Sequence, residues 1–470
     1  MNSIGREISN APGAGLSWLG IVRLGLVQTA LGAIVVLTTS TLNRVMVVEY
    51  GLAAMVPGAL VAWHYAVQSL RPRWGHGSDL GGRRTPWIVG GMALLALGGV
   101  LAAGATVLMG ASALWGAVLG VLAFAMIGIG VGASGTSLLA LLAAEVAPRR
   151  RAAAASTVWI MMIAGFVVTA ATAGQFLDPF SPERLMAVCS AVAAIAFVVS
   201  VLAVIGVEGP RSALQEDAPP PKTDFSAALR DVWNETPARR FTVFVFVSML
   251  AYSAQDLILE PFAGLVFGYT VGQSTQLAAV QHQGVLLGMI GFAVLGARLG
   301  ADTAAGLRLW AMRGCVASAV ALGSLALAAA IGPAWPLAAS VFAVGVANGV
   351  FAAAAIGSMM GLAGGGETGS AAPASSERRS GMRMGLWGAA QAIAFGGGGF
   401  LGTVAVDAMR SLDASPAAAY GSVFAAEAAL FIVAAWLALR VGQSAAGAGL
   451  QASSDQQRRL RPPLRGEVVS

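Results

Sequence analysis

Polar and charged side chains interrupt a long apolar stretch near the start of the chain. Residues 41–49 are Thr-Leu-Asn-Arg-Val-Met-Val-Val-Glu and contain Asn43, Arg44 and Glu49. Ionisable groups inside a membrane span are costly to bury, so proteins retain them for binding, ion pathways or proton transfer. We therefore treat these three residues as candidates for a functional site.

A second stretch of this kind occurs in the other half of the chain. Residues 255–261 are Gln-Asp-Leu-Ile-Leu-Glu-Pro, which adds Gln255, Asp256 and Glu260 as candidates. Asp256 and Glu260 are four residues apart and share one face of a helix. We expect Arg44 to pair with an acid of this stretch. The alternative is that the charged groups of both stretches mark the outer membrane interface, which suits Asp256 least because it sits deeper.

The chain has three histidines, and all of them lie in or beside apolar runs. His64 and His282 fall within the second and eighth runs, whereas His76 belongs to the loop after the second. A neutral imidazole can ligate a divalent metal, including the magnesium of a chlorin. His64 and His282 are therefore candidate pigment ligands. The alternative is that each one hydrogen-bonds a neighbouring helix.

No catalytic motif accompanies these residues. The sequence contains no H-E-x-x-H pair, nucleophile elbow, Walker loop or CxxC pair. Cys189 and Cys315 both lie inside apolar runs, which predicts buried small hydrophobic residues. We therefore expect no catalytic residue, no metal site and no firmly implied cofactor. A transporter-like carrier or assembly factor fits this pattern better than an enzyme.

The elements that position these residues must be membrane-spanning helices. The chain is 57% hydrophobic and 11% charged, with a mean hydropathy of +0.75, whereas a soluble domain carries roughly 25% charged residues. Apolar runs of about 20 residues match the thickness of a bilayer. The net charge of +6 would suit nucleic acid in a soluble protein. Here the positive residues lie between the apolar runs, so the partner is the lipid bilayer and not nucleic acid.

The apolar runs predict an all-α membrane protein with twelve transmembrane helices in two pseudo-symmetric six-helix halves. The N-terminal half is residues 1–207, a polar, proline-rich cytoplasmic linker follows at 208–240, and the C-terminal half is 241–440. The tail at 441–470 is expected to be disordered and cytoplasmic. The expected spans lie near 19–40, 52–70, 87–109, 114–142, 153–177, 185–205, 241–265, 277–299, 309–331, 335–360, 385–406 and 417–438.

The distribution of Lys and Arg predicts the orientation. With twelve spans, only Arg44, Arg184 and Arg410 of the 28 Lys and Arg lie on the side opposite the N-terminus. Cytoplasmic loops carry the excess of positive charge. We therefore expect a multi-pass membrane protein with both termini in the cytoplasm.

The loop after the second span resembles the cytoplasmic loop signature of major facilitator transporters. The matching positions are Gly75, Asp79, Gly82, Arg83 and Arg84. The resemblance implies the major facilitator fold and a gating loop. Glycines permit a tight turn, Asp79 can accept hydrogen bonds from a helix N-terminus of the other half, and the arginines can anchor the loop. The alternative is an ordinary positively charged loop.

Three more residues are candidates for the same gate. Glu145 and Arg149, at the end of the fourth span, are expected to pair with the loop. Asp302 ends the stretch Gly-Ala-Arg-Leu-Gly-Ala-Asp, which resembles a degraded copy of the loop in the second half. Internal repetition of this kind suits a fold of two related halves, in which the first and seventh helices line a central cavity.

Longer strings resemble the PucC family of photosynthetic bacteria. They are residues 23–49, which include Leu-Asn-Arg-Val-Met-Val-Val-Glu, together with 70–79, 81–87 and 255–262. The compact Gly-Ser-Asp-Leu-Gly-Gly-Arg-Arg-Thr-Pro loop is most similar to the branch labelled as a bacteriochlorophyll synthase accessory chain.

The resemblance implies a role in bacteriochlorophyll delivery at the intracytoplasmic photosynthetic membrane. The implied ligand is a tetrapyrrole pigment, with bacteriochlorophyll itself as the implied bound group. A pigment synthase, or light-harvesting or reaction-centre apoproteins, are the implied protein partners. The rival hypothesis from the residues alone is a proton-coupled small-molecule exporter, in which Asp256 or Glu260 would titrate during the cycle.

Overall fold

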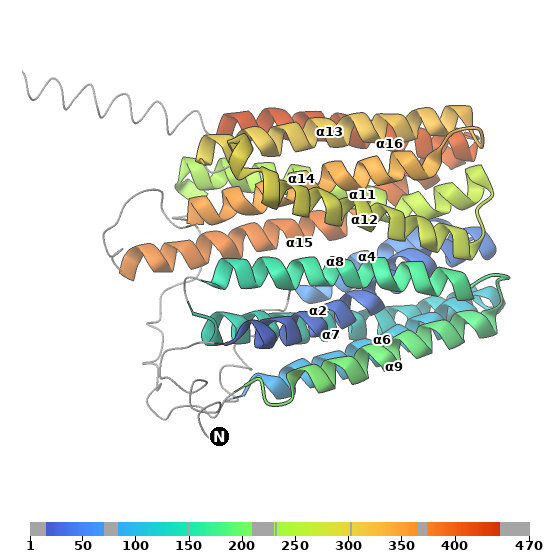
Figure 1. Cartoon of the computed structure of the whole chain (residues 1–470). Helices are drawn as coiled ribbons and strands as arrows, with labels where there is room; N and C mark the ends of the chain where they lie inside the picture. Colours follow the sequence, from blue (N-terminus) through green and yellow to red (C-terminus); the bar gives the residue numbers. More distant parts are fainter. Residues whose placement is uncertain are drawn as a thin grey trace, which may run out of the picture.

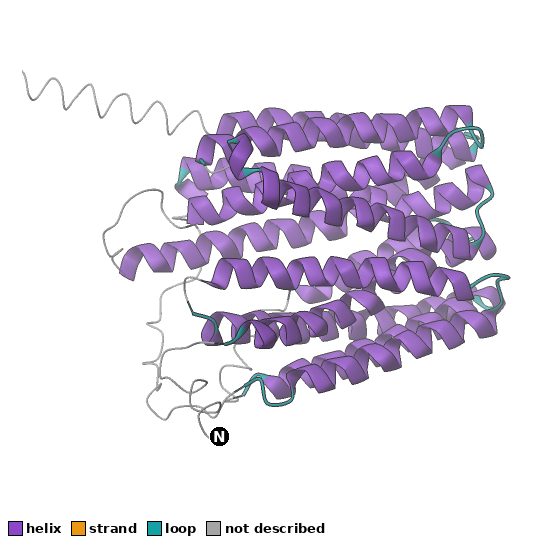
Figure 2. Cartoon of the chain, in the orientation of Figure 1, coloured by secondary structure: helices purple, strands orange, loops and turns teal. Residues whose placement is uncertain are grey.

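The computed structural model describes residues 16–69, 83–147, 150–208, 230, 233–300, 303–363 and 374–441. Within this part of the chain the long elements are helices joined by short loops (Figure 2). Lipid offers no hydrogen-bond partner, so each span must satisfy its backbone groups internally. The helices are α2 (Trp18–Val36), η1 (Leu37–Thr41), α3 (Leu42–Arg44), η2 (Val45–Glu49), α4 (Met55–Gln68), α6 (Thr85–Ala111), α7 (Ala113–Glu145), α8 (Arg151–Phe176), α9 (Pro182–Val204), α11 (Thr236–Phe267), α12 (Val271–Leu295), η4 (Ala297–Leu299), α13 (Ala304–Ile331), α14 (Leu337–Ala363), α15 (Ala374–Ser411) and α16 (Pro416–Val441).

Eleven helices in the described part are long and apolar enough to cross a membrane. They account for every predicted span except the second. That span corresponds to α4, which has 14 residues, and residues 70–82 after it lie outside the described residues. The all-α membrane architecture is confirmed, while the twelfth crossing stays a prediction.

The first crossing is longer than the sequence predicted. Its helix does not end near residue 40 but continues to Glu49 through two π-helical turns, η1 and η2, on either side of α3. A π-helical turn widens the helix while keeping the backbone hydrogen bonds inside the segment. As a result Asn43 and Arg44 are 1% and 2% exposed and lie inside the protein, not at its outer surface.

The helices form two groups, each with its own hydrophobic core. The first core gathers apolar side chains mainly from α2 to α9, with four more from α11 and α12, and the second gathers them from α11 to α16 and the loops between these helices. Figure 1 shows the N-terminal group below the C-terminal group, with all long helices running in roughly the same direction across the view. This arrangement agrees with the predicted division into two halves, while the count of six crossings in the N-terminal half stays a prediction.

The two groups meet through equivalent helices. α4 packs on α15 and α8 packs on α12, which pairs the second long helix of each group with the fifth of the other. Small residues permit the close approach: a Cβ added to Gly58 would meet Thr403, and one added to Gly272 would meet the backbone of Gly174. Pairing of this kind follows from a pseudo-twofold relation between the halves.

Candidate functional site

Polar side chains of the first crossing lie against α11 where the two groups meet. The Ser40 hydroxyl donates a hydrogen bond to the carboxylate of Glu260. Asn43 Nδ2 donates to the carbonyl oxygen of Leu257 over 2.6 Å. Ser40, Asn43 and Glu260 are all buried. The structure therefore brings together candidates from both of the polar stretches found in the sequence.

Pro261 explains why a backbone carbonyl of α11 accepts the bond from Asn43. In a helix the amide N–H of a residue bonds to the carbonyl four residues earlier. Pro261 lies inside α11 and has no N–H, so the carbonyl of Leu257 loses its helical partner. Asn43 supplies the missing donor from the opposite group, so these two positions form one structural unit.

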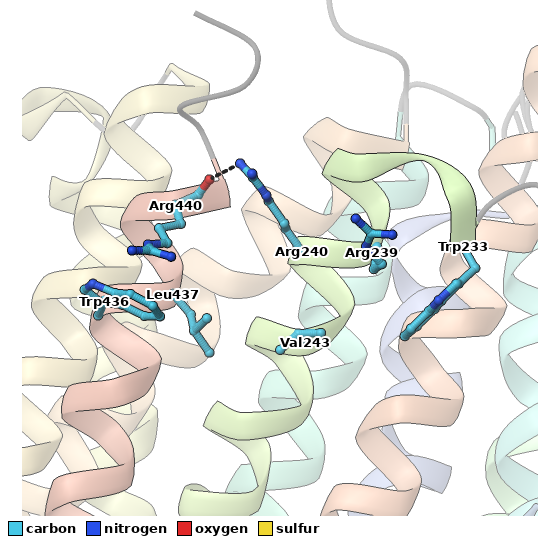
Figure 3. Close-up of a pocket in the computed structure, with 7 residues that line it drawn as sticks. All are labelled: Trp233, Arg239, Arg240, Val243, Trp436, Leu437 and Arg440. Atoms are coloured by element: carbon cyan, nitrogen blue, oxygen red, sulfur yellow. Dashed lines mark hydrogen bonds between the residues drawn. The ribbon is translucent and has the colours of Figure 1, made fainter. Parts of the chain in front are cut away.

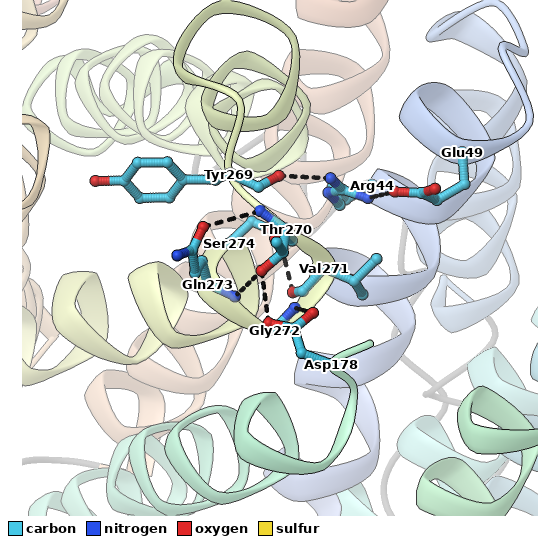
Figure 4. A network of polar contacts seen from close by, with 9 residues as sticks. All are labelled: Arg44, Glu49, Asp178, Tyr269, Thr270, Val271, Gly272, Gln273 and Ser274. Atoms are coloured by element: carbon cyan, nitrogen blue, oxygen red, sulfur yellow. Dashed lines mark hydrogen bonds and ion pairs between the residues drawn. The ribbon is translucent and has the colours of Figure 1, made fainter. Parts of the chain in front are cut away.

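Arg44, the residue after Asn43, makes further contacts where the two groups meet. It makes an ion pair with Glu49 and donates from Nη2 to the carbonyl oxygen of Tyr269 over 2.7 Å (Figure 4). The expected ion pair between Arg44 and an acid of the seventh span is therefore wrong. The π-helical register of η2 brings residues five apart onto one face, which places Glu49 within reach of Arg44.

Asp178 joins the two groups beyond Arg44. It follows α8, and its carboxylate accepts hydrogen bonds from Thr270 Oγ1 at 2.6 Å and from the Gly272 amide at 3.0 Å (Figure 4). Thr270 is also the N-cap of α12. A carboxylate at a helix N-terminus meets unpaired N–H groups and the positive end of the helix dipole. Asp178 therefore holds the start of α12.

Asp407 makes the matching contact on the other side of the pseudo-twofold. It lies near the end of α15, and its two carboxylate oxygens accept bonds from the amides of Ala54 at 3.0 Å and Met55 at 2.7 Å. These amides begin α4. We call the Asp178 and Asp407 contacts the two carboxylate latches. Sequence reasoning missed both, although each acid stands at the same end of an equivalent helix.

Most of the predicted gating loop lies outside the described residues. Gly75, Asp79, Gly82, Arg149 and Asp302 belong to those parts of the chain. Of the described members, Arg83 is exposed, Arg84 Nη1 donates to the carbonyl oxygen of Ala140 over 3.0 Å, and the carbonyl oxygen of Glu145 accepts from the Leu16 amide over 2.7 Å.

Glu208 is a further contact near this loop that the sequence did not single out. Its carboxylate accepts from the amides of Arg84 at 2.7 Å and Thr85 at 2.9 Å, and from Thr85 Oγ1 at 2.7 Å. Partial burial acts to raise the pKa of Glu208, but these hydrogen bonds and the Arg84 charge outweigh it, so the pKa lies below its usual range. Glu208 thus caps α6 as a carboxylate.

The two membrane histidines differ in their hydrogen bonding. His64 Nε2 lies 2.7 Å from Gln68 Nε2, one turn further along α4. His282 Nδ1 lies 2.8 Å from the carbonyl oxygen of Ala278, and its ring packs edge-on against Phe166 of α8, with centroids 4.8 Å apart. Because a carbonyl can only accept, His282 Nδ1 carries the proton and Nε2 presents its lone pair. His282 therefore lies where the two groups meet, in the tautomer that can ligate a metal.

The C-terminal group contains further buried polar groups. Asp256 accepts a hydrogen bond from Gln281 Nε2 at 3.2 Å. Gln255 is 1% exposed and Glu427, on α16, is 2% exposed. Neither side chain has a hydrogen-bond partner among the described residues. Glu427 was missed because only clusters of polar residues were selected from the sequence, and Glu427 is a single acid in an apolar run.

Comparison with known proteins identifies relatives over nearly the whole chain. The family model described as "PUCC protein" matches residues 41–446. The bacteriochlorophyll synthase 44.5 kDa chain of Rhodobacter capsulatus is 52% identical over 431 residues, which cover 91% of this chain and 96% of that protein. Protein PucC of Cereibacter sphaeroides is 29% identical, with coverage of 87% and 88%.

Transporters are among the solved structures that share this fold. A bacterial homologue of the human lysosomal transporter Spinster superposes with a TM-score of 0.60 at 16% identity, covering 90% of this chain and 96% of that one. The nucleoside transporter NupG gives 0.63 at 14% identity, with coverage of 90% and 99%. At these identities the likeness establishes the fold alone, and it confirms the predicted major facilitator architecture.

Proposed function

Because this chain belongs to the PUCC protein family, we propose that it is a membrane carrier or assembly factor that binds bacteriochlorophyll, or a precursor of it, and delivers it during photosynthetic pigment–protein biogenesis. The name of the 52%-identical relative supports the link to bacteriochlorophyll. The family and the transporter fold indicate a membrane protein that is not itself a catalyst, although that name contains the word synthase.

The observation that carries the proposal is the environment of His282. Its Nε2 lone pair is available, its Nδ1–H is fixed by Ala278, and Phe166 from the opposite group covers its ring. A fixed tautomer strengthens an imidazole as a metal ligand. An amphiphile with a flat magnesium-bearing ring and an apolar tail would reach His282 from the lipid side when α8 and α12, which pack on each other, move apart.

Replacing His282 tests this assignment. We expect the His282→Phe protein, gently solubilised and purified from its pigmented host, to retain at least about tenfold less bacteriochlorin than the parent, because a lost metal ligand lowers affinity at least as much as a lost supporting contact. The measurement is the near-infrared pigment absorption divided by protein concentration. Gln283→Leu, at an exposed neighbouring position of α12, is the matched control. If the parent protein carried no pigment after purification in several detergents, the pigment-binding proposal would be wrong. If the His282→Phe protein retained as much pigment as the parent, His282 would not be the ligand and the assignment would also fail.

A proton-coupled exporter is the second candidate, favoured by the buried carboxylates of the C-terminal group. Asp256, Glu260 and Glu427 all lie within spans, and intramembrane carboxylates commonly carry protons in transporters. In proteoliposomes with bacteriochlorophyllide as probe, Asp256→Asn should then abolish uptake driven by a pH gradient, while Asp413→Asn at an exposed loop position should not. If the parent protein took up bacteriochlorophyllide at the same rate with and without a pH gradient, the proton-coupled exporter would be excluded.

The proposed setting is the intracytoplasmic photosynthetic membrane, with both termini in the cytoplasm. The arginines expected on the opposite side support this orientation, because their contacts gather at one end of the bundle. Arg44 bonds to Tyr269, Arg184 bonds to the carbonyl oxygen of Asp178, and Arg410 follows Asp407 on α15. The proposed protein partners are the pigment synthase or the apoproteins that receive the pigment.

A further inference from the structure

A pocket rich in arginine lies at the end of the bundle where α11 begins and α16 ends (Figure 3). Its volume is about 240 Å³. Arg239, Arg240 and Arg440 supply its charge, Trp233 and Trp436 flank them, and none of the described residues that line it is an acid. The arginine distribution predicts that this end faces the cytoplasm.

Two of the three arginines, Arg240 and Arg440, are held by contacts within the pocket. The Arg440 guanidinium lies 3.6 Å from the centroid of the Trp436 ring, a cation–π contact that leaves the edge of the guanidinium free to donate. Arg240 Nη1 donates to the carbonyl oxygen of Arg440 over 3.2 Å (Figure 3). Arg239 is exposed on the first turn of α11. Three cations are thus gathered around one opening.

An apolar surface continues from the pocket toward the middle of the membrane. On α11, Val243 and Phe246 are exposed, and their spacing from Arg239 places all three on one face. On α16, Val433 and Trp436 share a face with Arg440 in the same way. The two helices pack on each other. The site is therefore cationic at its mouth and apolar along its length.

We propose that this pocket binds the phosphate headgroup of an anionic membrane lipid, whose acyl chains lie along α11 and α16. Arg guanidinium groups form paired hydrogen bonds with phosphate oxygens, and tryptophan prefers the headgroup level of a membrane. A soluble phosphate would bind only the arginines and would not contact the apolar surface of α11 and α16. Ordinary positive-inside anchoring requires neither a shared pocket nor two tryptophans beside it.

The test is lipid-dependent stability in nanodiscs of defined composition. Phosphatidylglycerol mixed into phosphatidylcholine should raise the unfolding temperature of the parent protein. In the Arg239→Gln/Arg440→Gln variant the apparent affinity for phosphatidylglycerol should fall roughly thirtyfold, which corresponds to about 2 kcal/mol for two cations near an anionic headgroup. Native mass spectrometry should show the matching loss of a tightly bound lipid.

Arg313→Gln is the matched control, because Arg313 also stacks on a tryptophan, Trp310, outside the pocket. It should leave the response to phosphatidylglycerol unchanged. Equal responses of the parent and the double variant would overturn the proposal. If inorganic phosphate alone stabilised the parent as strongly as the lipid does, the site would belong to a soluble anion and the lipid assignment would fail.

Discussion

Replacing both Asp178 and Asp407 with Asn should open the end of the bundle that the two carboxylate latches close. Each carboxylate bonds to the N-terminus of a helix in the opposite group, over 2.6–3.0 Å. A charged group at such a position stabilises by about 1 kcal/mol, so the two together contribute about 2 kcal/mol to the closed arrangement. The ratio of open to closed molecules should therefore rise roughly thirtyfold in the double variant.

Cysteine labelling can measure this opening. The two native cysteines are buried, and Thr275 is 0% exposed beside Thr41 at the interface. A Thr275→Cys substitution thus gives a reporter that a membrane-impermeant maleimide reaches only when this end opens. We expect the labelling rate to rise with the open fraction in the Asp178→Asn/Asp407→Asn background.

The control for charge alone is Asp413→Asn, since Asp413 is an exposed acid of the loop after α15 and the described residues show no bond to its carboxylate. Single latch variants should give intermediate rates, because the two contacts lie on opposite sides of the pseudo-twofold. An unchanged labelling rate in the double variant would mean that the latches do not govern opening, and that the Ser40, Asn43 and Arg44 contacts suffice to keep this end closed.

The architecture could be predicted from the sequence because a helix that crosses a membrane must be apolar and about 20 residues long. Apolar runs of the required length gave the spans, and the family strings gave the fold. The end of the first helix could not be predicted in this way. Asn43 and Arg44 look like the end of a span by hydropathy, yet partners on α11 and in the Tyr269 loop allow the helix to continue through them. Because these partners are distant in the sequence, the hydropathy of residues near Asn43 and Arg44 cannot predict them.

The candidate site was predictable where polar residues cluster and unpredictable where they act alone. The Asn43 and Glu260 stretches were found because each places several polar groups in an apolar background. Asp178, Asp407 and Glu208 are single acids at helix ends, where acids are common in any protein. Their role depends on a helix N-terminus supplied by another part of the chain, which only the fold reveals.

Replacing Asn43 with Leu should destabilise the protein much more when Pro261 is present than when it is replaced. Asn43→Leu removes the donor to the Leu257 carbonyl, and that buried acceptor then has no helical N–H because position 261 is proline. A buried acceptor left without a partner costs about 1–3 kcal/mol. The measurement is the free energy of unfolding in mixed detergent micelles, followed by tryptophan fluorescence.

Pro261→Ala supplies the internal test, because alanine restores the amide N–H that the Leu257 carbonyl lacks. In the Pro261→Ala background, Asn43→Leu should cost markedly less, giving an interaction energy of about 1–2 kcal/mol in the double-mutant cycle. Thr41→Val is the matched control: its bond to Thr275 does not involve Pro261, so its cost should be the same in both backgrounds. If Asn43→Leu cost the same in both backgrounds as well, the Asn43 side chain would be stabilising the interface by packing alone. An interaction energy of the expected size would instead show that a proline in one half and an amide in the other maintain a single hydrogen bond across the interface between the halves.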